Sequence, residues 1–169
     1  MKRISRLTLV LPLCASCLLA ASDDTTAQPT SGSRLINLSV LTSINSTGDT
    51  FTLGYVVGGS GTTGTKPLVI RAAGPSLGVL GVPGTLDDPR VELFAGSVKT
   101  GENDNWGGTE GLKAAFSTAG AFTLADASRD AATKVSLPPG GYTVLVSGVG
   151  NTTGLVLVEV PAPATTNRS

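Results

Sequence analysis

The residues best suited to chemistry in this chain are carboxylates and amides in one polar turn. Asn103, Asp104 and Asn105 follow one another within residues 102–108, a stretch whose polar and glycine content is typical of a loop. Carboxylate and amide oxygens gathered on a loop are the ligands that Ca²⁺ prefers. The sequence therefore predicts Ca²⁺ as a candidate cofactor, with Asp104 as the first ligand and Asn103 and Asn105 beside it. Asp and Asn also form turns by bonding the local backbone, and this alternative stays open.

Trp106 stands directly after this run and before two glycines, and it is the only tryptophan of the chain. In one interpretation its ring is a platform on which a sugar stacks, which makes Trp106 a ligand-binding residue. In the other, the indole folds back over the end of the domain and its N–H donates to a loop carbonyl. The second interpretation is favoured.

Two glycine motifs match catalytic or cofactor patterns by their letters alone. Residues 74–78 have the spacing of a serine nucleophile elbow, but that serine needs a histidine to take its proton and the chain has none. A helix is also not expected there, because the strand leads into further Gly and Pro residues. Residues 59–64 match the dinucleotide fingerprint, but Pro67 and its neighbours open another strand where a helix is required. Both motifs are predicted to be structural turns.

An enzyme that uses paired carboxylates is an alternative. Asp104 and Asp126 could act as acid and base of a polysaccharide hydrolase if the fold placed both in one cleft. Such clefts are usually lined with aromatic residues, which make up only 4% of this chain. The absence of histidine also removes the commonest general base. We therefore expect a protein that is not an enzyme, and the hydrolase remains the alternative.

Length and charge limit the remaining classes. The chain has 169 residues, which fits one ordinary domain, and its 12 basic residues balance 12 acidic ones. A chain without excess positive charge has no basic surface to attract nucleic acid, so no nucleic-acid partner is expected. A polysaccharide or a surface protein is the candidate partner, and the sequence does not determine the oligomeric state.

Apolar residues recur with a period of two along most of the chain, which indicates half-buried β-strands. In the first run Leu38, Val40 and Ile44 share one face, and clusters of Gly, Pro and Asn separate the runs. This spacing predicts an all-β fold, an antiparallel β-sandwich of jelly-roll type with about eight strands. The predicted strands cover residues 36–44, 51–57, 67–72, 90–94, 131–137, 142–147 and 155–160.

One segment breaks this pattern and predicts a short helix over residues 110–119. Ala115 and Phe116 fall on its apolar face, Thr109 is a candidate N-cap, and Gly120 follows its end. We expect this helix to close one end of the sandwich.

The first residues predict a secretory signal peptide. Lys2 and Arg3 precede an apolar run over residues 7–21, and small polar residues follow. The run is too short and too interrupted to span a bilayer, so no transmembrane segment is expected. The protein is therefore predicted to be secreted, to the periplasm, the cell surface or the medium. The predicted parts are a signal peptide over 1–27, a flexible lead-in over 28–33, a β-sandwich domain over 34–160 and a disordered tail over 161–169.

Both cysteines lie inside the predicted signal peptide, which leaves the mature chain without thiols. An alternative is a lipoprotein that is anchored at the surface through acylated Cys17. Against this alternative, apolar residues continue past Cys17, and Cys14 stands where such sites usually carry leucine.

A series of motifs carries a resemblance to a known kind of module. In order, these motifs are residues 70–77, Asp88-Pro89 with 91–94, residues 103–108, residues 137–143 and residues 146–154. The series resembles an uncharacterised β-sandwich module that recurs in exported proteins of Verrucomicrobia-like bacteria. It is also distantly similar to bacterial pre-peptidase C-terminal (PPC) domains, some of which bind calcium or polysaccharide. The resemblance implies a fold and export, carries over no catalytic residue, and implies Asp88 and Asp104 as positions for calcium.

Together these observations favour a secreted, non-enzymatic β-sandwich that serves in binding or adhesion at the cell surface or in the extracellular matrix, stabilised by calcium. Long loops rich in Gly, Asn and Thr at the ends of a rigid scaffold are where recognition usually occurs.

Overall fold

A computed structural model of the protein describes residues 37–59 and 61–162. The predicted signal peptide, the lead-in, Cys17 and the tail from residue 163 lie outside these residues. Within them the chain forms two antiparallel sheets of four strands each. The strands are β1 Ser39–Ile44, β2 Phe51–Val57, β3 Lys66–Ala73, β4 Pro89–Ala95, β5 Val98–Asn103, β6 Ala131–Leu137, β7 Gly140–Gly148 and β8 Gly154–Glu159.

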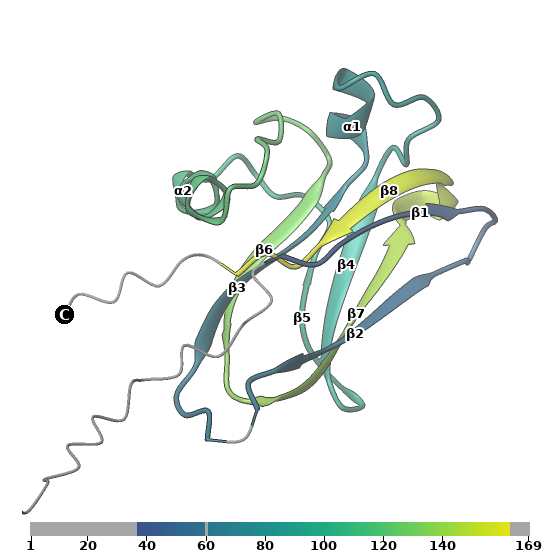
Figure 1. Ribbon diagram of the computed structural model, residues 1–169. Helices are drawn as coiled ribbons and strands as arrows, with labels where there is room; N and C mark the ends of the chain where they lie inside the picture. The colour runs from purple at the N-terminus through teal and green to yellow at the C-terminus, as the bar shows by residue number, and fades with distance from the viewer. Residues whose placement is uncertain (1–36, 60, 163–169) are drawn as a thin grey trace, which may run out of the picture. The chain divides into compact units, whose positions relative to one another are not determined.

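The two sheets have the strand orders β1-β8-β3-β6 and β2-β7-β4-β5, and they lie face to face (Figure 1). Strand β1 pairs with β8, β2 with β7, β3 with β6 and β4 with β5. The chain therefore forms one long antiparallel ribbon that is wound across both sheets, and the β3–β8 and β4–β7 pairings join its successive turns. This connectivity is a jelly roll, and it confirms the all-β sandwich that the spacing of apolar residues predicted.

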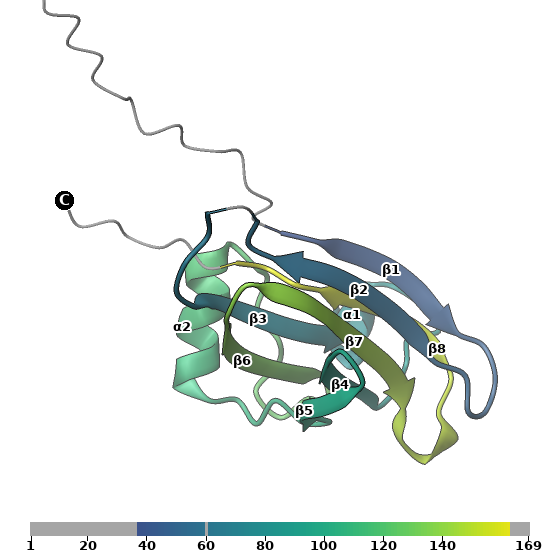
Figure 2. The same cartoon turned by 90° about the horizontal axis from the view of Figure 1, so that it is seen from below.

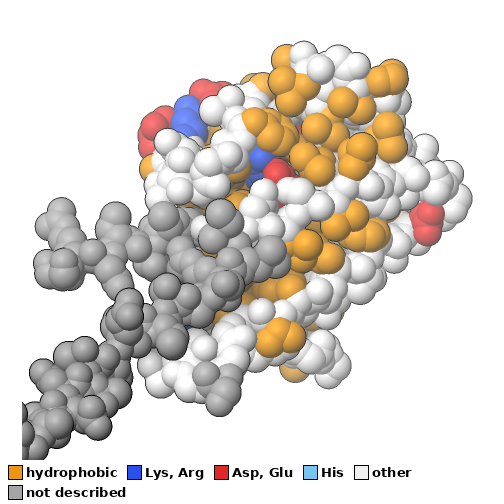
Figure 3. All heavy atoms as spheres, in the orientation of Figure 1, with side chains coloured by type: hydrophobic (Ala, Val, Ile, Leu, Met, Phe, Trp, Pro, Cys, Tyr) orange, Lys and Arg blue, Asp and Glu red, His pale blue; other side chains and the backbone are white. Residues whose placement is uncertain are grey.

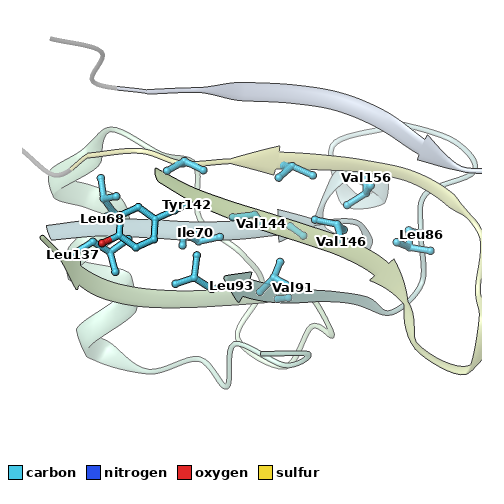
Figure 4. Close-up of a cluster of buried hydrophobic side chains, with 14 of the residues drawn as sticks. Leu68, Ile70, Leu86, Val91, Leu93, Leu137, Tyr142, Val144, Val146 and Val156 are labelled. Atoms are coloured by element: carbon cyan, nitrogen blue, oxygen red, sulfur yellow. The ribbon is translucent and has the colours of Figure 1, made fainter. Parts of the chain in front are cut away.

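The main core fills the space between the sheets. Inward side chains alternate with outward ones along each strand, as in β3, where Leu68, Ile70 and Ala72 face the second sheet. Figure 4 shows Leu68 and Ile70 in one layer with valines of β7 and β8. Val144, Val146 and Val156 are fully buried there. Small β-branched residues dominate this layer, which suits the pleated surface of a sheet.

A second, smaller core covers the outer face of the β1-β8-β3-β6 sheet. Val69 and Ala73 of β3 point to this face, and they pack with Phe116 of helix α2 (Glu110–Ala119). The helix has the predicted bounds, and Gly120 ends it in the left-handed conformation. It lies against the face of the sheet beside β3 and β6 (Figure 2), whereas the sequence predicted that it would close an end. The reason is that Val69 and Ala73 make the outward side of β3 apolar on both sides of Arg71, so this face also has to be covered.

The structure adds two elements that the sequence did not predict. Strand β5 has few apolar residues and is largely exposed, so it shows no alternation. Helix α1 (Pro75–Val79) follows β3 where a turn was expected, because Pro75 occupies the first helical turn without needing a backbone donor. A short 3-10 turn, Val149–Asn151, links β7 to β8. No helix of the described residues is long and apolar enough to cross a membrane.

Tyr55 and Tyr142 face each other across β2 and β7, with their ring centroids 5.8 Å apart. The Tyr142 hydroxyl donates to the carbonyl of Pro138 at 2.9 Å. The Tyr55 hydroxyl is buried and has no hydrogen-bond partner among the described residues. Burial, together with the nearby Tyr142, raises the pKa of Tyr55 to about 12.

These two hydroxyl groups are expected to respond differently to removal. Tyr142→Phe loses a hydrogen bond and leaves a carbonyl unpaired, so the free energy of unfolding should fall by about 1 kcal/mol. Tyr55→Phe removes a buried hydroxyl that has no hydrogen-bond partner in the described part of the chain, so stability should stay the same or rise. Urea denaturation of both variants measures the difference, and an equal loss in the two would contradict the assignment.

Candidate functional site

The predicted calcium loop lies at the end of β5 and forms one wall of an open, polar hollow. The hollow has a volume of about 260 Å³ and is lined by Arg90, Glu102, Asn103 and Asp104. Strand pairing positions these residues, because β4 and β5 are neighbours and Glu92 of β4 lies directly opposite Glu102. Arg90 is held by Glu102, with 2.6 Å between guanidinium and carboxylate. The hollow thus presents both charge signs and amide groups to solvent.

Asp88 does not line the hollow, but it directly precedes β4 and lies close enough to Asp104 for their charges to interact. Its side chain is only 16% exposed, and its Oδ1 atom is buried without a hydrogen-bond partner among the described residues. Its Oδ2 atom is 3.6 Å from the Arg129 guanidinium, which is largely exposed. Burial raises the pKa of Asp88, Arg129 opposes this rise, and the negative charges of Asp104 and Asp87 add to it. The structure therefore brings Asp88 and Asp104 into one electrostatic environment, with one carboxylate oxygen still to be satisfied.

Asn103 and Asn105 contribute differently from what the sequence predicted. The Asn103 side chain joins two sheets, since its Oδ1 accepts from the backbone N–H of Ala132 at 2.8 Å and its Nδ2 donates to the carbonyl of Asn105 at 2.9 Å. Asp104 and Asn105 are exposed. No three carboxylate, histidine or cysteine side chains in the described part of the chain gather closely enough to hold a metal. A calcium ion here would therefore draw on Asp88, Asp104 and oxygens of other kinds.

Trp106 does not present its ring to a ligand, which corrects its candidate role as a sugar platform. The side chain is only 2% exposed and packs on Phe116 of α2, with 5.6 Å between ring centroids. Its indole N–H donates to the carbonyl of Ala125 and to the Ser128 hydroxyl, both at 3.1 Å. The favoured interpretation, an indole folded back onto a loop carbonyl, is what the structure shows.

Asp130 is a buried structural residue that the sequence patterns did not identify. It is fully buried, and its Oδ1 accepts from the backbone N–H groups of Gly74 at 2.7 Å and Ser76 at 3.3 Å. Its Oδ2 accepts from the hydroxyls of Ser76 and Ser128. Its backbone carbonyl accepts from the N–H of Trp106 at 2.9 Å. The carboxylate of Asp130 thus ties together the end of β3, helix α1 and the loop before β6, and its backbone carbonyl adds Trp106.

The serine of the elbow-like motif belongs to this network. Ser76 does follow a strand and lies in a short helix, contrary to expectation. Its hydroxyl, however, is buried, donates to Asp130 and accepts from the N–H of Ala125 at 3.2 Å. Gly74 is needed because a Cβ atom there would lie 2.0 Å from the carbonyl oxygen of Leu86. The motif is a structural elbow, and its serine acts as a hydrogen-bonding residue of the interior.

A buried ion pair lies under the same loops. Arg71 of β3 is fully buried, and its Nε donates to Glu159 of β8 at 2.6 Å while a second nitrogen contacts the same carboxylate. The guanidinium also donates to the carbonyl of Phe122 at 2.6 Å and lies 4.1 Å from the centroid of the Phe122 ring. Burial lowers the pKa of Arg71, but arginine remains charged at any physiological pH. An arginine inside an apolar strand was the sequence signal for this pair.

The two carboxylates of the hydrolase alternative lie in different surroundings. Asp104 lines the hollow, whereas Asp126 does not and is held by Lys113 at 2.8 Å on an exposed surface beside α2. The hollow therefore offers Glu102 and Asp104 but not the pair that the alternative needs.

Removal of the Asp130 carboxylate should destabilise the whole domain. Asp130→Ala leaves several buried donors unpaired, so we expect the free energy of unfolding to fall by about 3 kcal/mol or more. Because Trp106 depends on the same loop, its fluorescence, the only tryptophan signal of the chain, should shift to the red. Asp126→Ala is the matched control and should cost less than about 1 kcal/mol, since that carboxylate is exposed. Equal losses in the two variants would show that the hydrogen bonds of Asp130 contribute no more to stability than an exposed carboxylate does.

Comparison with known proteins gives no relative: no protein family, no curated protein and no solved structure matches the chain. The resemblance to the exported module and to PPC domains therefore stays a prediction. A jelly roll supports many unrelated activities, so the fold alone assigns none. What the molecule can do has to be argued from the hollow and the surfaces described above.

Proposed function

We propose that the protein is an exported, non-enzymatic binding module, which acts at the cell surface or in the extracellular matrix and is stabilised by calcium at the hollow beside β5. The observation that carries the proposal is the Oδ1 atom of Asp88, which is buried without a hydrogen-bond partner among residues 37–59 and 61–162 and lies within the electrostatic influence of Asp104. A buried carboxylate oxygen without a donor costs free energy, and a bound cation would compensate for this cost.

The composition of the hollow supports a hydroxyl-rich ligand. Ca²⁺ takes several oxygen ligands in flexible geometry, and Asp88 and Asp104 supply only part of that set. The remaining positions would be open to water or to hydroxyl groups of a polysaccharide. Arg90, Glu102 and Asn103 add donors and acceptors around them. Because Trp106 is buried, recognition would rest on these polar groups and the ion rather than on stacking.

Calcium should stabilise the wild-type chain and have no effect on Asp88→Asn. At an ion concentration of 100 times the Kd, binding to the folded state adds about 2.7 kcal/mol, which raises the melting temperature by several degrees. Melts in EDTA and in CaCl₂ measure this shift. Asp104→Asn should reduce it, and Asp126→Asn, a control at an exposed carboxylate, should keep it. A shift that persists in Asp88→Asn would refute the site.

The pH dependence gives an independent check in EDTA. Since the folded state raises the pKa of Asp88 above its usual value of 3.8, this group favours folding fully below that value and loses its contribution as pH rises through the raised pKa. Asp88→Asn removes the penalty of a buried charge. The variant should therefore melt above the wild type at pH 7 without calcium, and the difference should vanish in acid. A variant less stable than the wild type at pH 7 would mean that Arg129 outweighs burial.

Binding itself can be tested on insoluble polysaccharides. The exported chain should be retained by at least one of peptidoglycan, chitin and cellulose in CaCl₂, and released by EDTA. Asp104→Asn should lower the retained fraction several-fold, because this exposed carboxylate lines the hollow, while Asp126→Asn should match the wild type. Retention that is insensitive to both EDTA and Asp104→Asn would place recognition elsewhere on the molecule.

A further inference from the structure

Strand β1 forms one edge of its sheet, and the register shows which of its backbone groups are unpaired. Leu38 and Val160 exchange both backbone hydrogen bonds, at 3.4 and 2.8 Å. Bonded and non-bonded pairs alternate in an antiparallel ladder, so Val40, Thr42 and Ile44 also bond β8. The backbone N–H and C=O groups of the residues between them, Ser39, Leu41 and Ser43, must therefore point away from β8. We call these three the outward-facing residues of the edge, after the direction of their backbone groups.

The far side of β8 confirms this assignment. Leu155, which lies opposite Ser43, donates to the carbonyl of Gly84 at 2.8 Å and accepts from Leu86 at 2.7 Å. Its backbone groups are therefore used on the side of β8 away from β1. The outward groups of β1 have no backbone partner among the described residues.

The β1 edge also lacks the features that prevent an edge strand from pairing with another chain. Its sequence, Ser-Val-Leu-Thr-Ser-Ile, has no charge and no proline, and its pairing with β8 has no bulge. The opposite side of the sandwich is protected. There, β5 carries Lys99 and Glu102 and pairs with β4 through a bulge, and the Asn103 side chain caps the N–H of Ala132 on β6. The contrast singles out the β1 side as available for pairing.

Apolar side chains flank this open edge. Leu41 is 58% exposed and lies beside Leu157 of β8 on the outer face of the sheet. Val79 and Leu80 at the end of α1 are 80% and 64% exposed. Figure 3 shows hydrophobic side chains gathered over α1 and continuing in a broken band over β8 and β1. An apolar surface next to unpaired backbone groups is the combination that a β-sheet interface buries.

We propose that a second copy of this chain pairs with the β1 edge, antiparallel and with Leu41 on the two-fold axis. In this register Leu41 faces Leu41 of the other copy, and each Ser39 faces a Ser43. All three outward-facing residues then meet outward-facing residues, so each pair can exchange both hydrogen bonds. The two β1-β8-β3-β6 sheets become one continuous sheet across the dimer.

Two features favour a copy of this chain over a foreign strand as the occupant. The outward-facing positions are spaced symmetrically about Leu41, so the edge is complementary to itself without any shift. The strand is also uncharged, so two copies meet without repulsion. The hollow lies at the opposite side of the sandwich, beside β5. The dimer is therefore independent of calcium and of the proposed function.

The test introduces a positive or a negative charge at position 41 and measures the mass of the exported chain in solution by sedimentation velocity or light scattering. The wild type should have the mass of a dimer in EDTA and in CaCl₂ alike. Leu41→Lys and Leu41→Glu should each be monomeric, because two like charges would meet on the axis. An equimolar mixture of the two variants should recover the dimer. Circular dichroism should show that both variants are folded, since Leu41 is an exposed side chain.

Val98→Lys and Val56→Lys are the matched controls. Val98 and Val56 are exposed apolar residues on the edge strands β5 and β2, and their substitution should leave the dimer intact. The proposal fails if the wild-type chain is monomeric at high micromolar concentration. It also fails if Leu41→Lys remains dimeric, if the mixture of oppositely charged variants stays monomeric, or if Val56→Lys alone dissociates the dimer.

Discussion

A carboxylate shielded from water must take its hydrogen bonds from the protein, and Asp130 takes them from segments far apart in the chain. Gly74 and Ser76 come from the end of β3 and the start of α1, while Ser128 lies in the loop that leads into β6. Since an unpaired buried charge is very costly, these segments cannot separate independently. The loop that they hold also accepts a hydrogen bond from the indole N–H of Trp106, which lies two residues after Asp104 of the hollow. The geometry of the surface beside β5 thus depends on a residue that no ligand can reach.

Polar groups have different roles in the interior and at the surface of this molecule. Inside, the titratable groups that could have suggested catalysis bond one another or the backbone, as Arg71 does with Glu159 and Ser76 with Asp130. Such paired polar groups hold the loops over the second core in one arrangement. Outside, one side of the sandwich offers a polar hollow and the other an uncharged strand edge. The binding module proposed above would need this division, because its scaffold must stay rigid while its surfaces remain available.

The periodicity of apolar residues was sufficient to predict the sandwich and most of its strands, and the helix over residues 110–119 was predicted at its observed bounds. Local patterns succeed where one face of an element is buried. They missed β5, because an exposed edge strand has no apolar face to show. They also could not separate Asp126 from Asp130, which occupy the same polar stretch and differ only in partners that are distant in sequence. The resemblance implied Asp88 and Asp104 as positions for calcium, but that one Asp88 oxygen is buried without a hydrogen-bond partner among the described residues follows from the packing alone.

The pairing of the first strand with the last has a mechanical consequence. Leu38 and Val160 are bonded neighbours, so residues 37 and 162 leave the domain at the same end of the β1–β8 pair. A pulling force applied between these two points acts along the hydrogen bonds and across the strands. It would peel β1 from β8 one pair at a time, from Leu38 toward Ile44, instead of shearing all pairs at once. A load that enters through β1 and leaves through the hollow beside β5 would cross the strands of both sheets, and the domain would resist it as a whole.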